Sequence, residues 1–365
     1  MSTLENVLSD FCSWEMFSII SSVTDSCKII GNKISNDSSE LQRSSESFNK
    51  SGDLKTNLDI YCNDLILTNL EMLDHVTAVI SEESDEIIRK NRGEKKYLVA
   101  FDPLDGSSNI SCEGELGTIF AIYRDTGELP SGNNIRCSGY VLYSYRTVLI
   151  LTFGEEIYRF YLDDNDKEFL FTTSNLSLPI EPKKILSVNV GNYERWEKAD
   201  KELYHYFIEN NYKIRYSGCM VMDVHRILME GGVFFYPKDS KNPKGKLRLI
   251  YECFPMSFII EAAGGISSTG EGRLLSVDPE EIHQKIPIYI GCKRDVFKVK
   301  QKRLDVIPDR ESMVCENFSA SGEDELFVRR GEEVRIVRRM NDNNWVVASK
   351  KDGEKGLLPT KCINL

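Results

Sequence analysis

Two short apolar runs that each lead directly to carboxylates constrain this chain most strongly. Val76–Ile80 leads to Glu82 and Glu83, and Tyr97–Phe101 leads to Asp102. Short continuous apolar runs are typical of strands that are buried on both faces of a sheet. Because ligands of open α/β sheets bind beyond the carboxyl ends of the strands, we expect these acidic side chains to surround a binding site.

The segment Phe101–Ile110, FDPLDGSSNI, joins potential metal ligands to potential phosphate ligands. Asp102 and Asp105 supply carboxylate oxygens, which Mg²⁺ prefers. Gly106 lets the backbone approach a ligand, and the two serines after it offer hydroxyl and N–H groups at a predicted helix start. Asp-Gly-Ser alone is typical of an ordinary turn. The whole string, placed after an apolar strand, favours a metal and phosphate site.

Other charged groups extend this pattern. The acidic pair at 82–83, which alone is typical of a solvated loop, would complete a site for two metal ions, an arrangement that suits phosphoryl displacement. Glu252 precedes a helix predicted from Pro255 to Ala263, where a carboxylate is often only a cap. Lys246 and Arg248 would share one face of a strand and could bind one anion. Taken singly, each of these two is typical of an ordinary surface cation.

The net charge excludes two classes of partner, and the cysteines and the N-terminus indicate the compartment. The chain has 365 residues and a net charge of -11, so nucleic acid and anionic membranes, which need a basic face, are not expected partners. The ten cysteines form no close pairs, which favours buried reduced thiols. The N-terminus lacks the pattern of a secretory signal, and no apolar stretch approaches the ~20 residues of a membrane span. A cytoplasmic protein is therefore expected.

Alternating helical and strand patterns predict an α/β fold with a small all-β domain at the C-terminus. A helix is predicted from Thr3 to Ile34, a mobile Ser-rich loop or linker from Ser35 to Asp53, and an amphipathic helix from Leu58 to Leu73. Further strands are predicted at Thr118–Tyr123, Ser138–Tyr143, Val148–Phe153, Ile157–Tyr161 and Lys184–Val188, and helices at Glu194–Asn210 and Val221–Glu230. The tail is predicted to form strands at Glu332–Arg338, Trp345–Ala348 and Gly356–Leu358.

Several strings together closely resemble the class I fructose-1,6-bisphosphatases of the inositol monophosphatase-like superfamily. They are SEE, FDPLDGSSNI, GTIFAIYR, RYSGCMVMDVHR, GGVFFYP, GKLRLIYECFPM and EAAGG, and the match runs from about Leu4 to Val299. The resemblance implies alternating helix and sheet layers in a catalytic region 1–304. Its metal and phosphate half would be about 1–175 and its sugar-binding half about 176–304. The change of sequence character near Asp305–Ser312 predicts a linker at 305–312.

The same resemblance implies an activity. It is the hydrolysis of the 1-phosphate of fructose 1,6-bisphosphate to fructose 6-phosphate and phosphate by metal-activated water, a step of gluconeogenesis. Two alternatives stay open. The substrate could be sedoheptulose 1,7-bisphosphate or another sugar bisphosphate, or the chain could be a scaffold that recruits partners through its C-terminal domain. A scaffold would be expected to lose acidic ligands, and this chain keeps them.

The resemblance also implies roles for individual residues. Two to three Mg²⁺ per subunit, or Mn²⁺ or Zn²⁺ in their place, would be held by Glu82, Asp102, the Leu104 carbonyl, Asp105, Glu252 and Asp53. With Asp53, the catalytic groups would be Asp59 and Glu83, which polarise the attacking water. The substrate ligands would be Gly106, Ser107 and Ser108 for the 1-phosphate, and Asn189, Tyr216, Tyr236, Lys246 and Arg248 for the sugar and 6-phosphate. Arg215 would reach a neighbouring subunit's site in a homotetramer.

This chain departs from the family pattern in places. Ser111 replaces the usual Asp, Asn192 stands where relatives carry Tyr or Asn, and the usual loop before Asp53 has become Ser-rich. Three residues, Lys96, Tyr97 and Arg124, match the allosteric nucleotide site of relatives. Since the Gly-Glu-Leu-Thr motif of animal relatives is barely recognisable at 13–17, AMP inhibition is not expected.

The tail, 313–365, resembles a Src-homology-3 (SH3) domain. The groove of such domains is lined by aromatic residues that bind Pro-rich peptides. Phe318, Trp345 and Pro359 keep this pattern, but Glu316 and Cys362 replace two expected tyrosines. The partner would then be either a Pro-rich peptide or this protein itself, through an intramolecular or oligomer contact.

Overall fold

The computed structural model describes residues 2–9, 12–36, 44–48, 54–90, 96–163, 165–305, 310–320, 325–339 and 345–363. Contacts divide the chain into two compact units. Unit 1 comprises Met1–Arg195 and Asn211–Val296, and unit 2 comprises Trp196–Asn210 and Phe297–Leu365.

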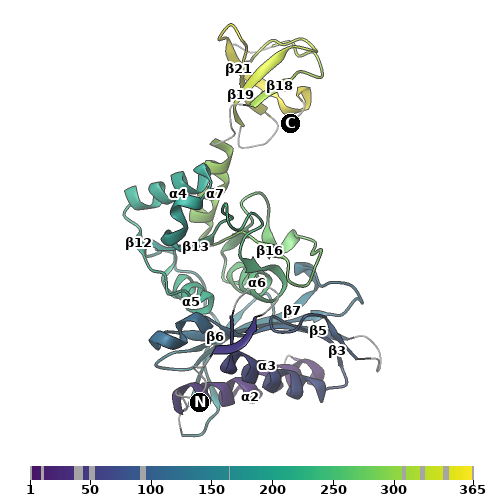
Figure 1. Ribbon diagram of the computed structural model, residues 1–365, viewed down its shortest axis with the longest axis vertical. Helices are drawn as coiled ribbons and strands as arrows, with labels where there is room; N and C mark the ends of the chain where they lie inside the picture. The colour runs from purple at the N-terminus through teal and green to yellow at the C-terminus, as the bar shows by residue number, and fades with distance from the viewer. Residues whose placement is uncertain are drawn as a thin grey trace. The chain divides into compact units, whose positions relative to one another are not determined.

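Unit 1 is built on an eight-stranded sheet with the order β10-β9-β8-β7-β6-β5-β3-β4 (Figure 1). Strand β3 (Val76–Ser81) runs parallel to β5 (Tyr97–Asp105), so their carboxyl ends meet at one edge, as predicted. The other neighbours pair antiparallel: β4 (Ile88–Arg89), β6 (Leu116–Arg124), β7 (Ile135–Tyr143), β8 (Val148–Thr152), β9 (Ile157–Leu162) and β10 (Phe169–Thr173).

Alternate residues of the central strands enter two different hydrophobic cores. Val99 and Phe101 pack with helices α2 (Trp14–Asn36) and α3 (Asn57–Glu71) on one face. Leu98 and Ala100 pack with α5 (Met220–Glu230) and α6 (Phe254–Ala262) on the other face. A strand covered on both faces has no solvent side, which explains the continuous apolar runs in the sequence.

A second sheet lies on the far side of α5 and α6 from the first, as Figure 1 shows. Its order is β12 (Lys213–Ile214), β11 (Ile185–Ser187), β13 (Val233–Tyr236), β17 (Ile288–Gly291) and β15 (Ile266–Ser268). A short pair, β14 (Leu247–Arg248) with β16 (Lys285–Ile286), accompanies it. The predicted α/β layering of helices and sheets is confirmed.

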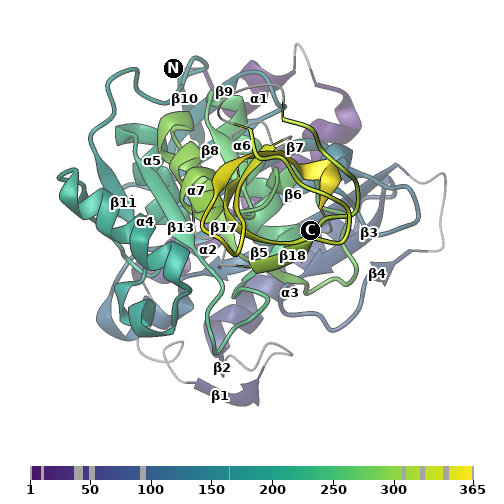
Figure 2. The same cartoon turned by 90° about the horizontal axis from the view of Figure 1, so that it is seen from above.

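The N-terminal region differs from the prediction in two places. The single helix expected at Thr3–Ile34 is divided into α1 (Leu4–Leu8) and α2, because Thr3 caps the first and the Ser13 hydroxyl accepts the Met16 N–H (N···O 3.2 Å) at the start of the second. The Ser-rich segment contains strand β1 (Ser44–Phe48), which pairs antiparallel with β2 (Leu54–Thr56) at the periphery of Figure 2. A low apolar content therefore did not prevent backbone pairing.

Two further boundaries differ. Residues expected to form one helix at Glu194–Asn210 form a 3₁₀ segment, η3 (Val190–Arg195), and then helix α4 (Lys198–Glu209). Helix α7 extends over Lys293–Asp305, and strand β18 begins at Arg310, inside the segment predicted as a linker.

The C-terminal tail forms a four-stranded antiparallel sheet. Its order is β18 (Arg310–Met313), β19 (Glu333–Arg339), β20 (Trp345–Ser349) and β21 (Lys355–Pro359). Buried Val, Ile and Leu side chains form its own small core, which also holds Cys362. Phe318 and Trp345 meet edge to face with ring centroids 5.7 Å apart. The strands predicted in the tail are confirmed.

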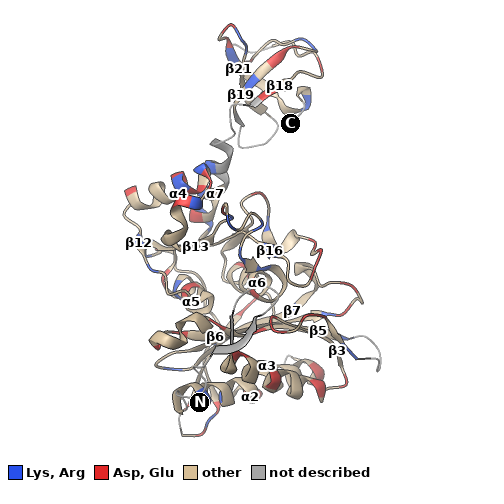
Figure 3. Cartoon of the chain, viewed as in Figure 1, with Lys and Arg blue, Asp and Glu red and all other residues tan. Residues whose placement is uncertain are grey.

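Acidic and basic positions are spread over the strands and helices of unit 1 in Figure 3. Among the described helices, none combines the length and apolar character needed to cross a membrane.

Gly117 of β6 sets how closely helix α5 approaches the sheet. A Cβ atom at this position would lie 2.5 Å from Cγ2 of Val221. We expect Gly117→Ala to lower the free energy of unfolding by about 1–3 kcal/mol, because overpacking displaces neighbours that cannot move freely. Chemical denaturation measures this change. Gly272→Ala is the matched control, since nothing lies within 4 Å of the added atom. An equal effect of the two substitutions would contradict this account of the helix–sheet contact.

Candidate functional site

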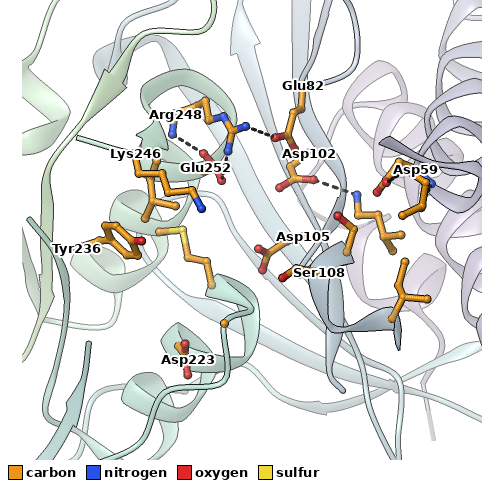
Figure 4. Close-up of a pocket in the computed structure, with 18 of the residues that line it drawn as sticks. Asp59, Glu82, Asp102, Asp105, Ser108, Asp223, Tyr236, Lys246, Arg248 and Glu252 are labelled. Atoms are coloured by element: carbon orange, nitrogen blue, oxygen red, sulfur yellow. Dashed lines mark hydrogen bonds and ion pairs between the residues drawn. The ribbon is translucent and has the colours of Figure 1, made fainter. Parts of the chain in front are cut away.

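One pocket of about 430 Å³ contains most of the predicted site residues (Figure 4). This volume is in the range of small-molecule sites. Four of the five side chains predicted to hold metal line it, Asp53 being outside the described residues: Glu82, Asp102, Asp105 and Glu252. The remaining predicted residues that line it are Asp59, Glu83, Leu104, Gly106, Ser107, Ser108, Tyr216, Tyr236, Lys246 and Arg248. All of these belong to unit 1.

The end of strand β5 supplies the centre of the pocket. Asp102 accepts the Leu104 N–H at 3.0 Å and is 2 % exposed. Burial, followed by repulsion from Glu82, raises the pKa of Asp102 well above its usual value. Gly106 has a φ of 82°, a left-handed conformation that suits glycine, and leads into the 3₁₀ helix η1 (Ser107–Cys112). The predicted helix start after the glycine is confirmed.

Asp105 connects the sheet to helix α5. Its Oδ2 accepts the Val221 N–H at 2.6 Å and the Cys219 thiol at 3.1 Å, at the first turn of that helix. The helix N-terminus favours the charged carboxylate. Burial nevertheless dominates and raises the pKa of Asp105. Two segments far apart in sequence are therefore fixed to each other through one carboxylate.

Asp59 belongs to the first turn of α3 and faces the pocket from the side opposite Tyr236 in Figure 4. It forms a capping box with Thr56: Oδ2 of Asp59 accepts the Thr56 N–H at 2.6 Å, and the Thr56 hydroxyl accepts the Asp59 N–H at 3.1 Å. Burial raises the pKa of Asp59 to about 6, while the bonds from Thr56 oppose that rise. Its carboxyl can therefore exchange a proton near neutral pH.

Arg248 forms ion pairs with two carboxylates of the acidic cluster. Its guanidinium lies 2.8 Å from Oε1 of Glu82 and 3.7 Å from Oε1 of Glu252. Burial raises the pKa of Glu252 to about 8, which the positive charge of Arg248 opposes. Sequence analysis placed Arg248 among the substrate ligands, whereas here its charge is engaged by carboxylates. The substrate role of Arg248 is thus not visible in this arrangement.

The acidic cluster has the chemistry of a hard-cation site. Its donors are buried carboxylate oxygens from β5 and from the π-helical turn Leu249–Cys253, and the partly buried carboxylate of Glu82 after β3. Within the described residues, no three His, Cys, Asp or Glu side chains already converge closely enough to hold an ion. Because neighbouring carboxylates repel one another, a divalent cation would relieve the repulsion that Arg248 only partly offsets. The donor set therefore fits Mg²⁺.

The opposite end of the pocket is cationic and aromatic. Tyr236 extends into it from strand β13, and Lys246 from the turn just before strand β14, as Figure 4 shows. Tyr216 also lines it, and burial raises the pKa of that phenol, while a hydrogen bond with Asn189 acts in the other direction. An anion bound here would lie on the far side of the pocket from Asp59.

The structure keeps several predicted residues outside this pocket. Asn189 does not line the pocket but is hydrogen-bonded to Tyr216, and Arg215 is exposed, donating to the Ile214 carbonyl at 2.7 Å. Asp53 lies outside the described residues. The three residues of the possible nucleotide site, Lys96, Tyr97 and Arg124, gather at the other end of β5, where Tyr97 and Arg124 face each other on neighbouring strands. Lys96 pairs there with Glu15 at 2.9 Å and lowers the pKa of Glu15 to about 2.

Sequence analysis missed three groups that support the pocket. Asp223 on α5 lines it, and burial raises the pKa of Asp223 to about 7. Cys219 and Thr56 hold Asp105 and Asp59 in place. Asp223 and Cys219 are part of the RYSGCMVMDVHR string, but neither has a spacing that relates it to the aspartates of β5. Thr56 with Asp59 does carry a sequence signal, since Thr followed three residues later by an acid is the pattern of a helix cap.

The comparisons with known proteins agree over most of the chain. Residues 4–174 match the family model of the fructose-1-6-bisphosphatase N-terminal domain, 180–303 that of the C-terminal domain, and 316–360 that of the SH3 domain. The chain is 42% identical over 266 residues to fructose-1,6-bisphosphatase isozyme 2 of Bos taurus, covering 68% of this chain and 78% of the relative. It is 37% identical over 303 residues to the class 1 fructose-1,6-bisphosphatase of Acinetobacter baumannii, covering 78% and 93%.

The fold comparison gives the same answer. The crystal structure of Leishmania major fructose-1,6-bisphosphatase in holo form matches with a TM-score of 0.78 and 33% identity, covering 83% of this chain and 98% of that one. The chain therefore belongs to the fructose-1,6-bisphosphatase family of phosphatases and carries an SH3-like domain at its C-terminus.

Proposed function

We propose that this chain hydrolyses the 1-phosphate of fructose 1,6-bisphosphate with Mg²⁺ as cofactor, in the cytoplasm, giving fructose 6-phosphate and phosphate. The observation that carries the proposal is the order of groups across one pocket. Asp59 lies at one side of the pocket, the acidic cluster lies in the middle with Ser108 beside it, and Lys246 and Tyr236 lie at the other side. A sugar that carries a phosphate at each end matches this order of charges.

In the proposed mechanism the phosphate to be removed binds at Gly106, Ser107 and Ser108, beside the acidic cluster. Mg²⁺ ions held by the carboxylates of Glu82, Asp102, Asp105 and Glu252, with the Leu104 carbonyl and Asp53, would neutralise negative charge and activate water. Asp59, together with Glu83, would accept the proton of that water, since its pKa of about 6 leaves it ionised at neutral pH.

The bond changes follow from this arrangement. The water oxygen forms a bond to phosphorus while the bond from phosphorus to the sugar O1 breaks. O1 leaves with the electron pair and gains a proton from solvent, while the base returns to solvent the proton that it took from water. Because water attacks phosphorus directly, no phosphoenzyme forms. At the other end, Asn189, Tyr216, Tyr236 and Lys246 would hold the sugar and its 6-phosphate. Charge neutralisation and positioning would supply most of the rate enhancement.

We also propose that copies of the chain associate into a homo-oligomer, as the family resemblance implies for a tetramer. Arg215 supports this, because it is exposed and absent from the pocket of its own chain. The C-terminal domain would serve a partner other than the substrate, either a peptide or this protein itself. Its groove keeps Phe318 and Trp345 in contact, but Glu316 is exposed and Cys362 is buried.

Removing the carboxylate of Asp105 tests the proposed site. Asp105→Asn keeps an oxygen that can accept the Val221 N–H, so the fold should survive while one negative charge is lost. We expect phosphate release from fructose 1,6-bisphosphate with Mg²⁺ to fall at least about a hundredfold, as for other groups that stabilise transition-state charge. Asp166→Asn, on an exposed residue outside the pocket, is the matched control. Equal rates for both variants would refute the site assignment. If the wild-type protein released phosphate faster from sedoheptulose 1,7-bisphosphate than from fructose 1,6-bisphosphate, the former would be the assigned substrate.

The raised pKa values of the cluster predict how Mg²⁺ binding depends on pH. The pKa of Asp59 is about 6 and that of Glu252 is about 8 in the folded protein. Both carboxyl groups therefore bind a proton more tightly in the folded state than in the unfolded state. In metal-free protein their ionisation therefore costs stability as pH rises through these values. Since Mg²⁺ needs the ionised form of its proposed ligand Glu252, it should raise Tm more at pH 8 than at pH 5.5. A thermal shift of the same size at both pH values would contradict this.

Deleting the C-terminal domain should leave hydrolysis intact. All residues that line the pocket lie between Thr56 and Glu252. We expect the chain shortened to 1–311 to keep kcat/KM within about twofold of the full chain, as for changes remote from a site. Steady-state kinetics on both proteins at matched concentration measures this. A loss of activity together with a smaller oligomer would instead assign the domain to subunit contacts.

A further inference from the structure

Asn192 sits directly behind the cationic end of the pocket and contacts one of its lining residues. Its Nδ2 lies 3.0 Å from the hydroxyl of Tyr236. Both residues are nearly buried, at 8 % and 7 % exposure. Asn192 does not line the pocket itself, so any effect on a ligand must pass through Tyr236.

The other side of the Asn192 amide meets Arg195. A guanidinium nitrogen of Arg195 donates to Oδ1 of Asn192. Because a guanidinium has only donors, the atom that faces it must be the amide oxygen. The NH₂ group is then forced to face Tyr236. This orientation of the amide follows from chemistry, since the two ends of an amide look alike in shape.

Arg195 is itself fixed in place by the turn that follows Tyr236. Its Nε lies 3.7 Å from Oδ2 of Asp239, whose carboxylate is 1 % exposed. Its backbone carbonyl accepts the Ser240 N–H at 3.1 Å. Oδ1 of Asp239 accepts the N–H groups of Lys241 and Asn242, both at 2.8 Å. A buried carboxylate thus compensates the charge of Arg195. The effect of Arg195 on Asn192 is therefore to fix which way the amide group faces.

We propose that Arg195 and Asn192 form a directional relay that points the Tyr236 O–H hydrogen into the pocket, toward the phosphate of a bound sugar phosphate. The NH₂ group of Asn192 can only donate, so the Tyr236 oxygen accepts from it. The hydroxyl hydrogen must then point away from Asn192, where it donates to an anionic oxygen beside Lys246. Arg195 and Asn192 are positioning residues, and Tyr236 is the group that touches the ligand. The relay rests on the proposed function, because it presumes a sugar phosphate at this end.

Asn192→Asp reverses the relay without changing the shape of the side chain. One carboxylate oxygen still accepts from Arg195, while the other accepts the Tyr236 hydroxyl hydrogen and so turns it away from the pocket. We expect the Kd for fructose 6-phosphate, measured by calorimetry with Mg²⁺, to rise about tenfold, the size of a lost hydrogen bond to a charged group. KM for fructose 1,6-bisphosphate should rise in parallel, with kcat changed less than about twofold.

A double-mutant cycle separates the relay from simple repulsion by the new charge. Tyr236→Phe alone should weaken binding by a similar factor, and Tyr236→Phe with Asn192→Asp should bind no more weakly than Tyr236→Phe alone. Additive losses would show that the carboxylate acts through its charge and would overturn the relay. Asn165→Asp, in the exposed loop between β9 and β10, makes the same charge change outside the pocket and should leave Kd unaltered.

The remaining outcomes are also decisive. Unchanged binding by Asn192→Asp, in a wild-type background that hydrolyses the bisphosphate, would overturn the relay and leave the proposed function intact. A wild-type protein that neither binds fructose 6-phosphate nor hydrolyses the bisphosphate would overturn both. If Asn192→Asp fails to fold, the same cycle with Asn192→Leu, which has neither donor nor acceptor, gives the test. Asn192→Leu should weaken binding of fructose 6-phosphate when Tyr236 is present. In a protein that already carries Tyr236→Phe, it should have no further effect.

Discussion

The parallel pairing of β3 with β5 is the constraint on which the rest of unit 1 depends. It brings the carboxyl ends of two strands to one edge, so that Glu82 and the aspartates of β5 share a pocket. Burying these groups together is costly, because each carboxylate raises the proton affinity of its neighbours. Burial of both sheet faces in two apolar cores supplies the stability that such a cluster requires.

Helices α5 and α3 complete the site because their first turns donate hydrogen bonds to individual carboxylates or cap them. Asp105 receives the first N–H groups of α5, and Asp59 is fixed by the cap of α3. Arg248 offsets part of the negative charge between the sheets. Each support uses a backbone group or a buried partner, so the carboxylates have little rotational freedom. This is the kind of preorganisation on which electrostatic catalysis relies.

Sequence alone predicted the central strands, because a strand buried on both faces leaves a continuous apolar run such as Val76–Ile80. It also predicted the carboxylates of the pocket, since FDPLDGSSNI places two aspartates and a Gly-Ser-Ser turn directly after an apolar strand. It did not predict that Arg248 would face Glu82 and Glu252, because a strand position gives the face of a side chain but not its partner. Nor did it find Asp223 or the bond from Asn192 to Tyr236, which depend on contacts between segments distant in sequence. The division of the N-terminal helix and the strand at Ser44–Phe48 were missed because local capping and backbone pairing outweighed composition.

The capping box at the start of α3 has a consequence for proton affinity. The Thr56 N–H belongs to the last residue of β2, which pairs with β1, and it also stabilises the ionised form of Asp59. If strand β2 moved and this N–H were withdrawn, the Asp59 carboxylate would become a stronger base and its pKa would rise. The geometry of a peripheral two-stranded ribbon is thereby coupled to the protonation state of a group inside the pocket.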